Sequence, residues 1–308
     1  MSIPKRVRVI VATVVVLFLI MASFVVFSKF IGSVLDTSIS STNVNTADDR
    51  NDLLQYEWTQ FQGDSSFTRF SAGPAPEAPD ILWKTNIGGI RSYISAFNGE
   101  VFVIANTTVF ALGRKAGNII WNTTVPAPGP WPAVYKIDDT HMVVGNSCLD
   151  PDTGQILWAS ANFSASPQPL FSYNVYSPEE KLFYVKESSY VHAWNFSDPS
   201  IPPTVAWSTY VSGSGSVGSG IEYGDGKVFP GSYESHQMAL DAKTGAVLWD
   251  TETTGPMLFS GTYSNGMFFR GGTHDNIFYA FNATTGKVEW TFNPGTSDGY
   301  WCVGASAV

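Results

Sequence analysis

Four histidines and two cysteines are among the side chains of this sequence that could hold a metal ion or act as nucleophiles. The histidines show no H-x-x-H or H-E-x-x-H spacing, and each falls in a different part of the chain. They are His141, His192, His236 and His274. Cys148 and Cys302 also lack metal-ligand spacing, and two cysteines are too few for a disulfide-stapled scaffold. The sequence predicts no metal site and leaves open whether the cysteines pair.

A glycine-rich stretch at 212–220, "SGSGSVGSG", could suggest a phosphate-binding loop. It lacks the Lys-Ser/Thr ending of such loops, and no helix that could hold an anion is predicted after it. We interpret it as a flexible connection between two structural repeats. No nucleophile elbow, in which a serine lies on a sharp turn between a strand and a helix, is predicted elsewhere in the sequence, so a hydrolase-type nucleophile is not indicated either.

Five asparagines lie in N-x-Ser/Thr triplets and could carry glycans if this part of the chain lies outside the cytoplasm. They are Asn106, Asn122, Asn162, Asn195 and Asn282. Asparagine is also frequent in β-turns, which competes with the glycan interpretation. Glycosylation is favoured more at Asn122 and Asn162 than at Asn282, whose side chain is expected to stabilise a turn.

The composition indicates short strands joined by tight turns. Aromatic residues make up 14% of the chain, charged residues only 14%, and there are 28 glycines and 18 prolines. The net charge of -9 would repel a phosphate backbone, and no basic patch offsets it. We therefore predict an all-β protein and exclude nucleic acid as a partner.

The N-terminus carries the signature of a membrane segment. Lys5, Arg6 and Arg8 precede an uncharged apolar run of nineteen residues at 9–27, which would span ~28 Å as a helix. We predict that residues 1–30 form a cytoplasmic tip and a transmembrane signal-anchor, with the rest of the chain outside the cytoplasm. A cleaved signal peptide and a buried core helix are the alternatives. The polar stretch 31–54 is predicted to be a flexible stalk, and residues 55–308 the folded domain.

An eleven-residue frame recurs through this domain. It appears as "ALGRKAGNIIW" at 111–121, "CLDPDTGQILW" at 148–158, "ALDAKTGAVLW" at 239–249 and "AFNATTGKVEW" at 280–290. In each copy a tryptophan follows a glycine by four residues: Gly117 and Trp121, Gly154 and Trp158, Gly245 and Trp249, Gly286 and Trp290. A fifth copy, "AWNFSDPSIPPTVAW" at 193–207, keeps the small first residue and Trp207 but replaces Thr-Gly with a longer connection.

The repeat period indicates the blade of a β-propeller. The frames begin 37 to 46 residues apart, the length of a four-stranded unit. Upstream of each frame, a turn precedes an alternating apolar strand, and within the frame Asp-x-x-Thr-Gly suits a tight hairpin. The stretch ending in tryptophan is expected to be the outermost strand of each blade.

The frame Ala-x-Asp-x-x-Thr-Gly-x-x-x-Trp resembles the tryptophan-docking motif of the quinoprotein-type propeller superfamily. Its members include PQQ-dependent alcohol dehydrogenases and the assembly-type (BamB-like) propellers. The resemblance implies that Trp121, Trp158, Trp249 and Trp290, with Trp207, pack against the neighbouring blade near its small residue and turn glycine. Cys148 occupies the slot where the other frames have alanine, so we expect it to serve packing.

The strand count predicts five full blades with an unmatched strand at each end. Trp83, in "ILWKTNIGG", is predicted to mark an outer strand without inner strands, and "GYWCVGASAV" resembles the inner strand of a further blade. Rings of this superfamily usually have eight blades. An incomplete sequence is favoured, and closure through a partner or an oligomer is the alternative.

The resemblance raises an enzymatic interpretation, in which PQQ stacks on a tryptophan over the propeller axis and calcium is bound by carboxylates and an amide. No position here matches those ligands or the catalytic aspartate. Trp301 is a conceivable stacking residue, but a core aromatic at the start of a strand is the favoured interpretation. We therefore favour a membrane-anchored, extracytoplasmic binding or assembly module that uses its loop faces for a protein or glycan. A PQQ-dependent dehydrogenase and a structural cell-surface repeat protein are the alternatives.

Overall fold

The computed structural model describes residues 56–73, 80–90, 92–129, 132–165, 174–187, 189–211 and 220–295. These residues all fall in one compact unit, Arg50–Val308. No helix long and apolar enough to span a membrane occurs among them. The expected membrane segment and stalk lie outside the described residues, as do most of the glycine-rich connection at 212–220 and both Trp301 and Cys302.

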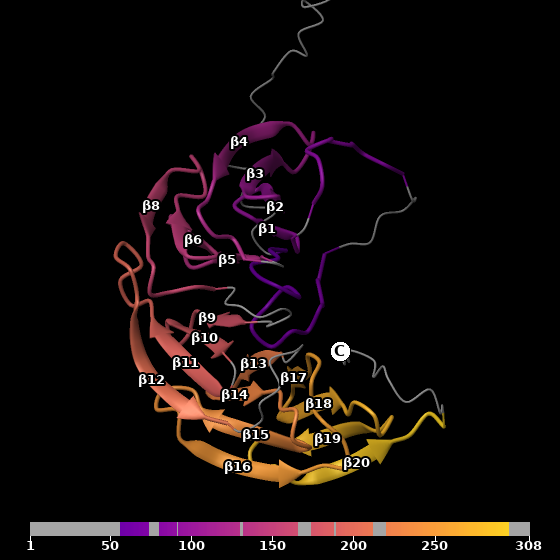
Figure 1. Cartoon of the computed structure of the whole chain (residues 1–308). Coiled ribbons are helices and arrows are strands. Elements are labelled where there is room, and N and C mark those ends of the chain that lie inside the picture. The colour runs from indigo at the N-terminus through magenta and orange to yellow at the C-terminus, as the bar shows by residue number, and fades with distance from the viewer. Residues whose placement is uncertain are drawn as a thin grey trace, which may run out of the picture. The chain divides into compact units, whose positions relative to one another are not determined.

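Five antiparallel sheets of four strands each make up the described part of the chain (Figure 1). The first consists of β1 (Ser95–Phe97), β2 (Glu100–Ala105), β3 (Thr108–Gly113) and β4 (Ile119–Thr124). The second consists of β5 (Val134–Lys136), β6 (Met142–Val144), β7 (Ser147–Leu149) and β8 (Ile156–Ala159). The third consists of β9 (Val175–Ser177), β10 (Leu182–Glu187), β11 (Tyr190–Asn195) and β12 (Thr204–Tyr210).

The last two sheets follow the same plan. The fourth consists of β13 (Ile221–Gly224), β14 (Lys227–Pro230), β15 (His236–Asp241) and β16 (Val247–Glu252). The fifth consists of β17 (Thr262–Ser264), β18 (Met267–Gly271), β19 (Phe278–Asn282) and β20 (Val288–Phe292). Strands follow one another in chain order within every sheet, and the first strands of neighbouring sheets pack together, as β9 does on β13 and β13 on β17. The predicted propeller of four-stranded blades is confirmed.

Asparagine or aspartate followed by glycine closes the first hairpin in three blades. At 98–99, 225–226 and 265–266 both residues have positive φ, between 49° and 79°. Two consecutive positive φ values define a type I′ turn, whose twist matches that of the flanking strands. The sequence therefore sets the register of these hairpins locally.

The third and fourth strands of every blade share one register. The first residue of each frame lies opposite the frame's tryptophan, and a β-bulge follows directly. The pairs are Ala111 with Trp121, Cys148 with Trp158, Ala193 with Trp207, Ala239 with Trp249, and Ala280 with Trp290. A small side chain at this position leaves room for the indole ring, and the bulge fixes the strand twist at the same point in each blade. Cys148, fully buried, fills this slot in the second blade.

Candidate functional site

Four tryptophans contact the following blade through the same two hydrogen bonds, one from the indole and one from a nearby threonine. Trp121 donates from Nε1 to the carbonyl of Pro151 at 2.8 Å, and Thr123, two residues later, donates from Oγ1 to the carbonyl of Gly154 at 2.7 Å. The indole bonds recur at 2.9–3.0 Å from Trp83 to Arg114, Trp207 to Ala242 and Trp249 to Ala283. The threonine bonds recur from Thr85, Thr209 and Thr251 to the carbonyls of Gly117, Gly245 and Gly286.

The turn glycine lies against the ring in each of these contacts. Any β-carbon on Gly117, Gly154, Gly245 or Gly286 would collide with the tryptophan of the preceding unit. The eleven-residue frame ends at the tryptophan, so it did not include the threonine that lies two residues later. The signal was present, since Trp-x-Thr occurs at 83–85, 121–123, 207–209 and 249–251.

The contact between Trp158 of the second blade and the divergent third blade differs from the others. Trp158 donates from Nε1 to the carbonyl of Pro199 at 2.8 Å, in the connection that replaces Thr-Gly. Its ring meets Phe163 edge-on and lies tilted against Phe196, at centroid distances of 6.2 Å. The sulfur of Cys148 lies 3.8 Å from the same Pro199 carbonyl. Aromatic packing thus takes the place of the glycine contact at this junction.

Trp83 and Trp290, at the two ends of the blade series, differ from the rest. Residues 81–87 form no ladder with any described strand. The inner strands that an outer strand at Trp83 would pair with are not among the described residues, so that outer strand stays a prediction. The described contacts of this stretch with the first blade come from the side chains of Trp83 and Thr85. Trp290 is 47% exposed, and none of the described glycines lies against its ring.

The five glycan triplets lie in turns and on outer surfaces. Asn106, Asn122, Asn162 and Asn195 are exposed, and Asn282 is half-buried. The Oδ1 atom of Asn282 accepts hydrogen bonds from the backbone N–H groups of Thr284 and Thr285, both at 3.1 Å, which is the turn role expected of it. Asn195 caps its own turn in a similar way, through Ser197. Asn122, in β4, accepts no such turn bond among the described contacts.

The innermost strands surround a segment that lies outside the blades. In Figure 1 the indigo chain at the start of the described residues lies beside β1, β5, β9, β13 and β17. Its side chains Gln60, Phe61 and Phe67 are 3%, 7% and 0% exposed, and both phenylalanines belong to the main hydrophobic core. This segment, 57–69, is called the axial segment below.

A buried ion pair joins the fourth and fifth blades. Glu222 on β13 and Arg270 on β18 are fully buried and bonded to each other. Arg270 also donates to Oε1 of Gln237 at 2.7 Å, and Glu222 accepts from the N–H of Gly261 at 2.9 Å. Burial raises the pKa of Glu222 to about 7, although Arg270 opposes this. In the sequence, Glu222 and Arg270 are each the only charged residue of a short apolar strand. This signal of a buried ion pair was not recognised from the sequence.

The histidines do not converge on one site. His141 bonds Asp138 at 2.9 Å, His192 bonds Ser208 at 2.8 Å and His236 bonds Asp250 at 2.9 Å, each within its own blade. Over the described ranges, no three His, Cys, Asp or Glu side chains gather in a way that could hold a metal ion.

Among the described residues, those at the axis offer no place for PQQ and calcium. Gln60, Phe61 and Phe67 fill the space between the inner strands, and the carboxylate of Glu222 is engaged by Arg270. The described residues offer no cluster of carboxylates there that could bind calcium. Trp301, the conceivable stacking residue, lies outside the described residues.

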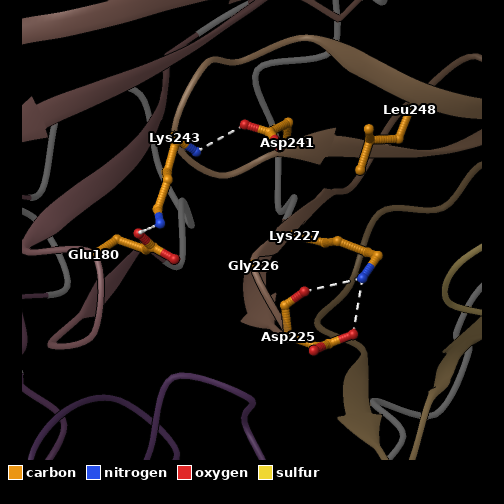
Figure 2. A pocket seen from close by; sticks show the side chains of 7 residues that line it. All are labelled: Glu180, Asp225, Gly226, Lys227, Asp241, Lys243 and Leu248. Carbon is orange, nitrogen blue, oxygen red and sulfur yellow. Dashed lines mark hydrogen bonds and ion pairs between the residues drawn. The ribbon is translucent and has the colours of Figure 1, made fainter.

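An open pocket of about 320 Å³ lies at the turns between the third and fourth blades (Figure 2). Its lining is Glu180, Asp225, Gly226, Lys227, Asp241, Lys243 and Leu248. Figure 2 shows Lys243 extending toward Glu180, with 3.4 Å between the charged atoms, and Lys227 bonded to Asp225 at 2.9 Å. The Lys243 side chain is 74% exposed, so its ammonium is free to form a new pair at low cost.

The side of the propeller that carries these turns is called the turn face. Asp241 is occupied there by its own turn, since it accepts from the N–H groups of Lys243 and Thr244. Of the remaining groups, Lys243 and Asp225 have mostly exposed side chains, whereas those of Glu180 and Lys227 are 12% and 13% exposed. Their alternating charges suit a polar ligand that carries groups of both signs.

Blades joined by tryptophan contacts, together with an occupied axis and a polar pocket among the turns, define a propeller of the quinoprotein type. The chain belongs to the PQQ_2 family, described as outer membrane protein assembly factor BamB, whose model matches residues 141–303. No curated protein sequence matches the chain.

Solved structures show the same fold at low sequence identity. BamB from Moraxella catarrhalis is 14% identical, with a TM-score of 0.54 over 68% of this chain and 64% of that one. The quinohemoprotein alcohol dehydrogenase ADHIIG from Pseudomonas putida HK5 is 14% identical, with a TM-score of 0.55 over 82% and 50%. The quinohemoprotein alcohol dehydrogenase from Comamonas testosteroni is 13% identical, with a TM-score of 0.52 over 84% and 52%. The matched part therefore spans 50–64% of the length of these proteins.

Proposed function

We propose that this chain is a binding or assembly module that holds a segment of a partner protein at the turn face of its propeller. One observation carries the proposal: the axis, where a cofactor would lie, is filled by Gln60, Phe61 and Phe67, whereas the open pocket lies among the turns. Membership of the family described as an assembly factor supports it. A glycan ligand at this face is the alternative.

The charges of the pocket support a peptide ligand. The ammonium of Lys243 lies 3.4 Å from the carboxylate of Glu180, and the side chain of Lys243 is mostly exposed. Their pairing therefore contributes little to stability. A peptide with a basic and an acidic side chain would replace this contact by two new ones. Complementary charges at an interface raise the association rate and the specificity.

We also propose that segment 9–27 anchors the chain in a membrane and that the propeller lies on the extracytoplasmic side. Lys5, Arg6 and Arg8 before the apolar run support this orientation. Proteolysis of sealed vesicles tests it: protease added outside inverted vesicles is expected to spare the propeller. Digestion of the propeller in such vesicles would contradict the orientation.

Photo-crosslinking of the full chain in its native membrane tests the binding proposal. A photoreactive amino acid replaces Lys243 and, as a matched control, Lys115, which occupies the same frame position in the first blade. We expect one discrete cross-linked protein from position 243 and none from position 115. Glu180→Gln combined with Asp225→Asn should abolish the product. Equal products from both positions, or a glycan-only product, would contradict the proposal.

A direct assay distinguishes the dehydrogenase alternative from the binding-module proposal. PQQ and calcium are added to the full-length protein, and quinone absorbance and dye-linked oxidation of alcohols and sugars are measured. Saturable PQQ binding with turnover would replace the binding-module proposal by the enzymatic one.

A further inference from the structure

The innermost strand of each blade has one edge that no other strand of its sheet covers. In every sheet the first strand pairs only with the second, so its other edge faces the axis. Backbone N–H and C=O groups on such an edge need partners, and an extended peptide can provide them.

The axial segment hydrogen-bonds this edge in all five blades. Trp58 exchanges both backbone bonds with Ala96 on β1, at 2.7 and 2.8 Å. The carbonyl of Thr59 accepts from the N–H of Lys136 on β5 at 2.8 Å. The remaining contacts are Gln60 with Tyr176 on β9, Ser65 with Tyr223 on β13, and Ser66 with Tyr263 on β17.

The contacts of Gln60 and of the Ser66 hydroxyl with this edge depend on particular side chains. The amide of Gln60 donates to the carbonyl of Tyr176 at 3.1 Å and accepts from its N–H at 3.0 Å, which are the two bonds that a neighbouring strand would make. The hydroxyl of Ser66 donates to the carbonyl of Tyr223 at 2.9 Å. Side-chain contacts of this kind select a sequence, whereas backbone pairing alone does not.

Two phenylalanines hold the segment in the core. Phe61 and Phe67 meet edge to face at 5.4 Å, and Phe61 lies 4.2 Å from the ring of Tyr93. Asp64 closes the loop between them by accepting from the N–H groups of Ser66 and Thr68. A loop that is closed by its own contacts loses less entropy when it binds.

The two ends of the segment are also attached. The carboxylate of Glu57 accepts from the ammonium of Lys136 at 2.7 Å and from the N–H of Asn98 at 2.9 Å. At the other end, Arg69 donates to the hydroxyl of Ser260 at 3.2 Å. Contacts therefore extend along the whole of 57–69, and the chain after it is exposed at Phe70.

We propose that the innermost strands form a peptide-binding site and that the axial segment of the same chain is its ligand. The site recognises a peptide with glutamine and serine at the positions of Gln60 and Ser66 and with two aromatic anchors. The blades and the segment are thus two parts that are held together non-covalently. This inference does not rest on the proposed function of the turn face.

A full chain with a protease site inserted directly after Gly73 tests the proposal. After cleavage, the N-terminal part is expected to co-elute with the blades in size-exclusion chromatography. A labelled synthetic peptide of residues 56–70 should then exchange into the site with saturable kinetics. Release of the N-terminal part on cleavage, while the blades keep their melting temperature, would overturn the proposal.

Variants show whether the named contacts hold the segment. Gln60→Glu, which loses the amide donor, and Ser66→Ala are each expected to speed release at least about 10-fold. Ser71→Ala is the control, since the one hydrogen bond of its hydroxyl among the described residues is to Gly73, and it should release at the original rate. Each variant is compared after its uncut form is shown to be folded by circular dichroism. Equal release from all forms, or a dimer that exchanges segments between copies, would overturn the in-chain assignment.

Discussion

The ring of Trp249 in the fourth blade lies directly against Gly286 in the fifth. A β-carbon built on Gly286 would lie 2.6 Å from Cδ2 of the indole. Gly286 also has a φ of +73°, which disfavours any other residue. Two independent causes therefore require glycine here, and they can be separated experimentally.

Replacing Gly286 by alanine should destabilise the propeller by about 3 kcal/mol. The left-handed backbone accounts for about 1–2 kcal/mol, and the collision with Trp249 adds about 1–3 kcal/mol. Gly266→Ala is the matched control, because Gly266 has a φ of +77° but no atom within 4 Å of a β-carbon. Urea unfolding followed by fluorescence measures both variants. Equal losses of unfolding free energy would show that the ring contact has no energetic importance.

The blades could be predicted from the sequence because their determinants are local. The frame of 280–290 contains the turn, the small residue and the tryptophan within eleven positions, and the period repeats it along the chain. The Asn-Gly turn at 265–266 similarly sets its hairpin without help from distant residues.

The axial segment could not be predicted in this way, because it does not repeat and its partners are distant. Gln60 bonds Tyr176, which is 116 residues away, and Gln62 bonds Ser260, which is 198 residues away. Such contacts leave no periodic pattern. The ion pair of Glu222 and Arg270 was missed for the same reason, since its partners belong to different blades.

Thr251→Val should cost about 1 kcal/mol of unfolding free energy. The change keeps the shape of the side chain but removes the bond from Oγ1 to the carbonyl of Gly286 at 2.8 Å. Thr124→Val on β4 is the control, because its hydroxyl meets only the exposed hydroxyl of Thr108 in the described contacts. The control should stay within about 0.5 kcal/mol of the original chain. Indistinguishable urea midpoints for the two variants would contradict the role given to Thr251.

Cys148→Ala should cost about 1 kcal/mol or less, whereas Cys148→Leu should cost about 1–3 kcal/mol through overpacking. Four other blades place alanine in the same position opposite tryptophan, so the slot accepts a smaller group. Thermal melts in a Cys302→Ser background measure both variants. A larger loss for alanine than for leucine would contradict the packing role.

The thiol of Cys148 should also resist alkylation in the folded chain. Burial raises the pKa of Cys148 to about 12, so the thiolate is scarce at pH 8. In the Cys302→Ser background, iodoacetamide labelling at pH 8 should be at least about 100-fold slower in buffer than in urea. Rapid labelling in buffer would show that the site opens or that the thiol is reactive.

The buried carboxyl of Glu222 should make the propeller less stable as the pH rises from about 4.5 to about 7. Burial raises the pKa of this carboxyl from its ordinary value of 4.5 to about 7. The folded state therefore binds more protons than the unfolded state between these values, and its extra stability is present below the unfolded pKa and lost as the pH passes the folded pKa. For one proton the slope is at most about 1.4 kcal/mol per pH unit.

Glu222→Gln isolates this effect, because the amide keeps a hydrogen-bonding oxygen for Arg270 and Gly261 but does not titrate. Unfolding free energies at pH 4.5, 6 and 7.5 should fall more steeply for the original chain than for the variant. Glu234→Gln, at an exposed position, is the control and should keep the original slope. The two chains should be closest in stability at pH 4.5, where the carboxyl is protonated and Arg270 faces a neutral partner in both. Parallel pH curves for the original chain and Glu222→Gln would mean that Arg270 keeps the carboxylate ionised throughout.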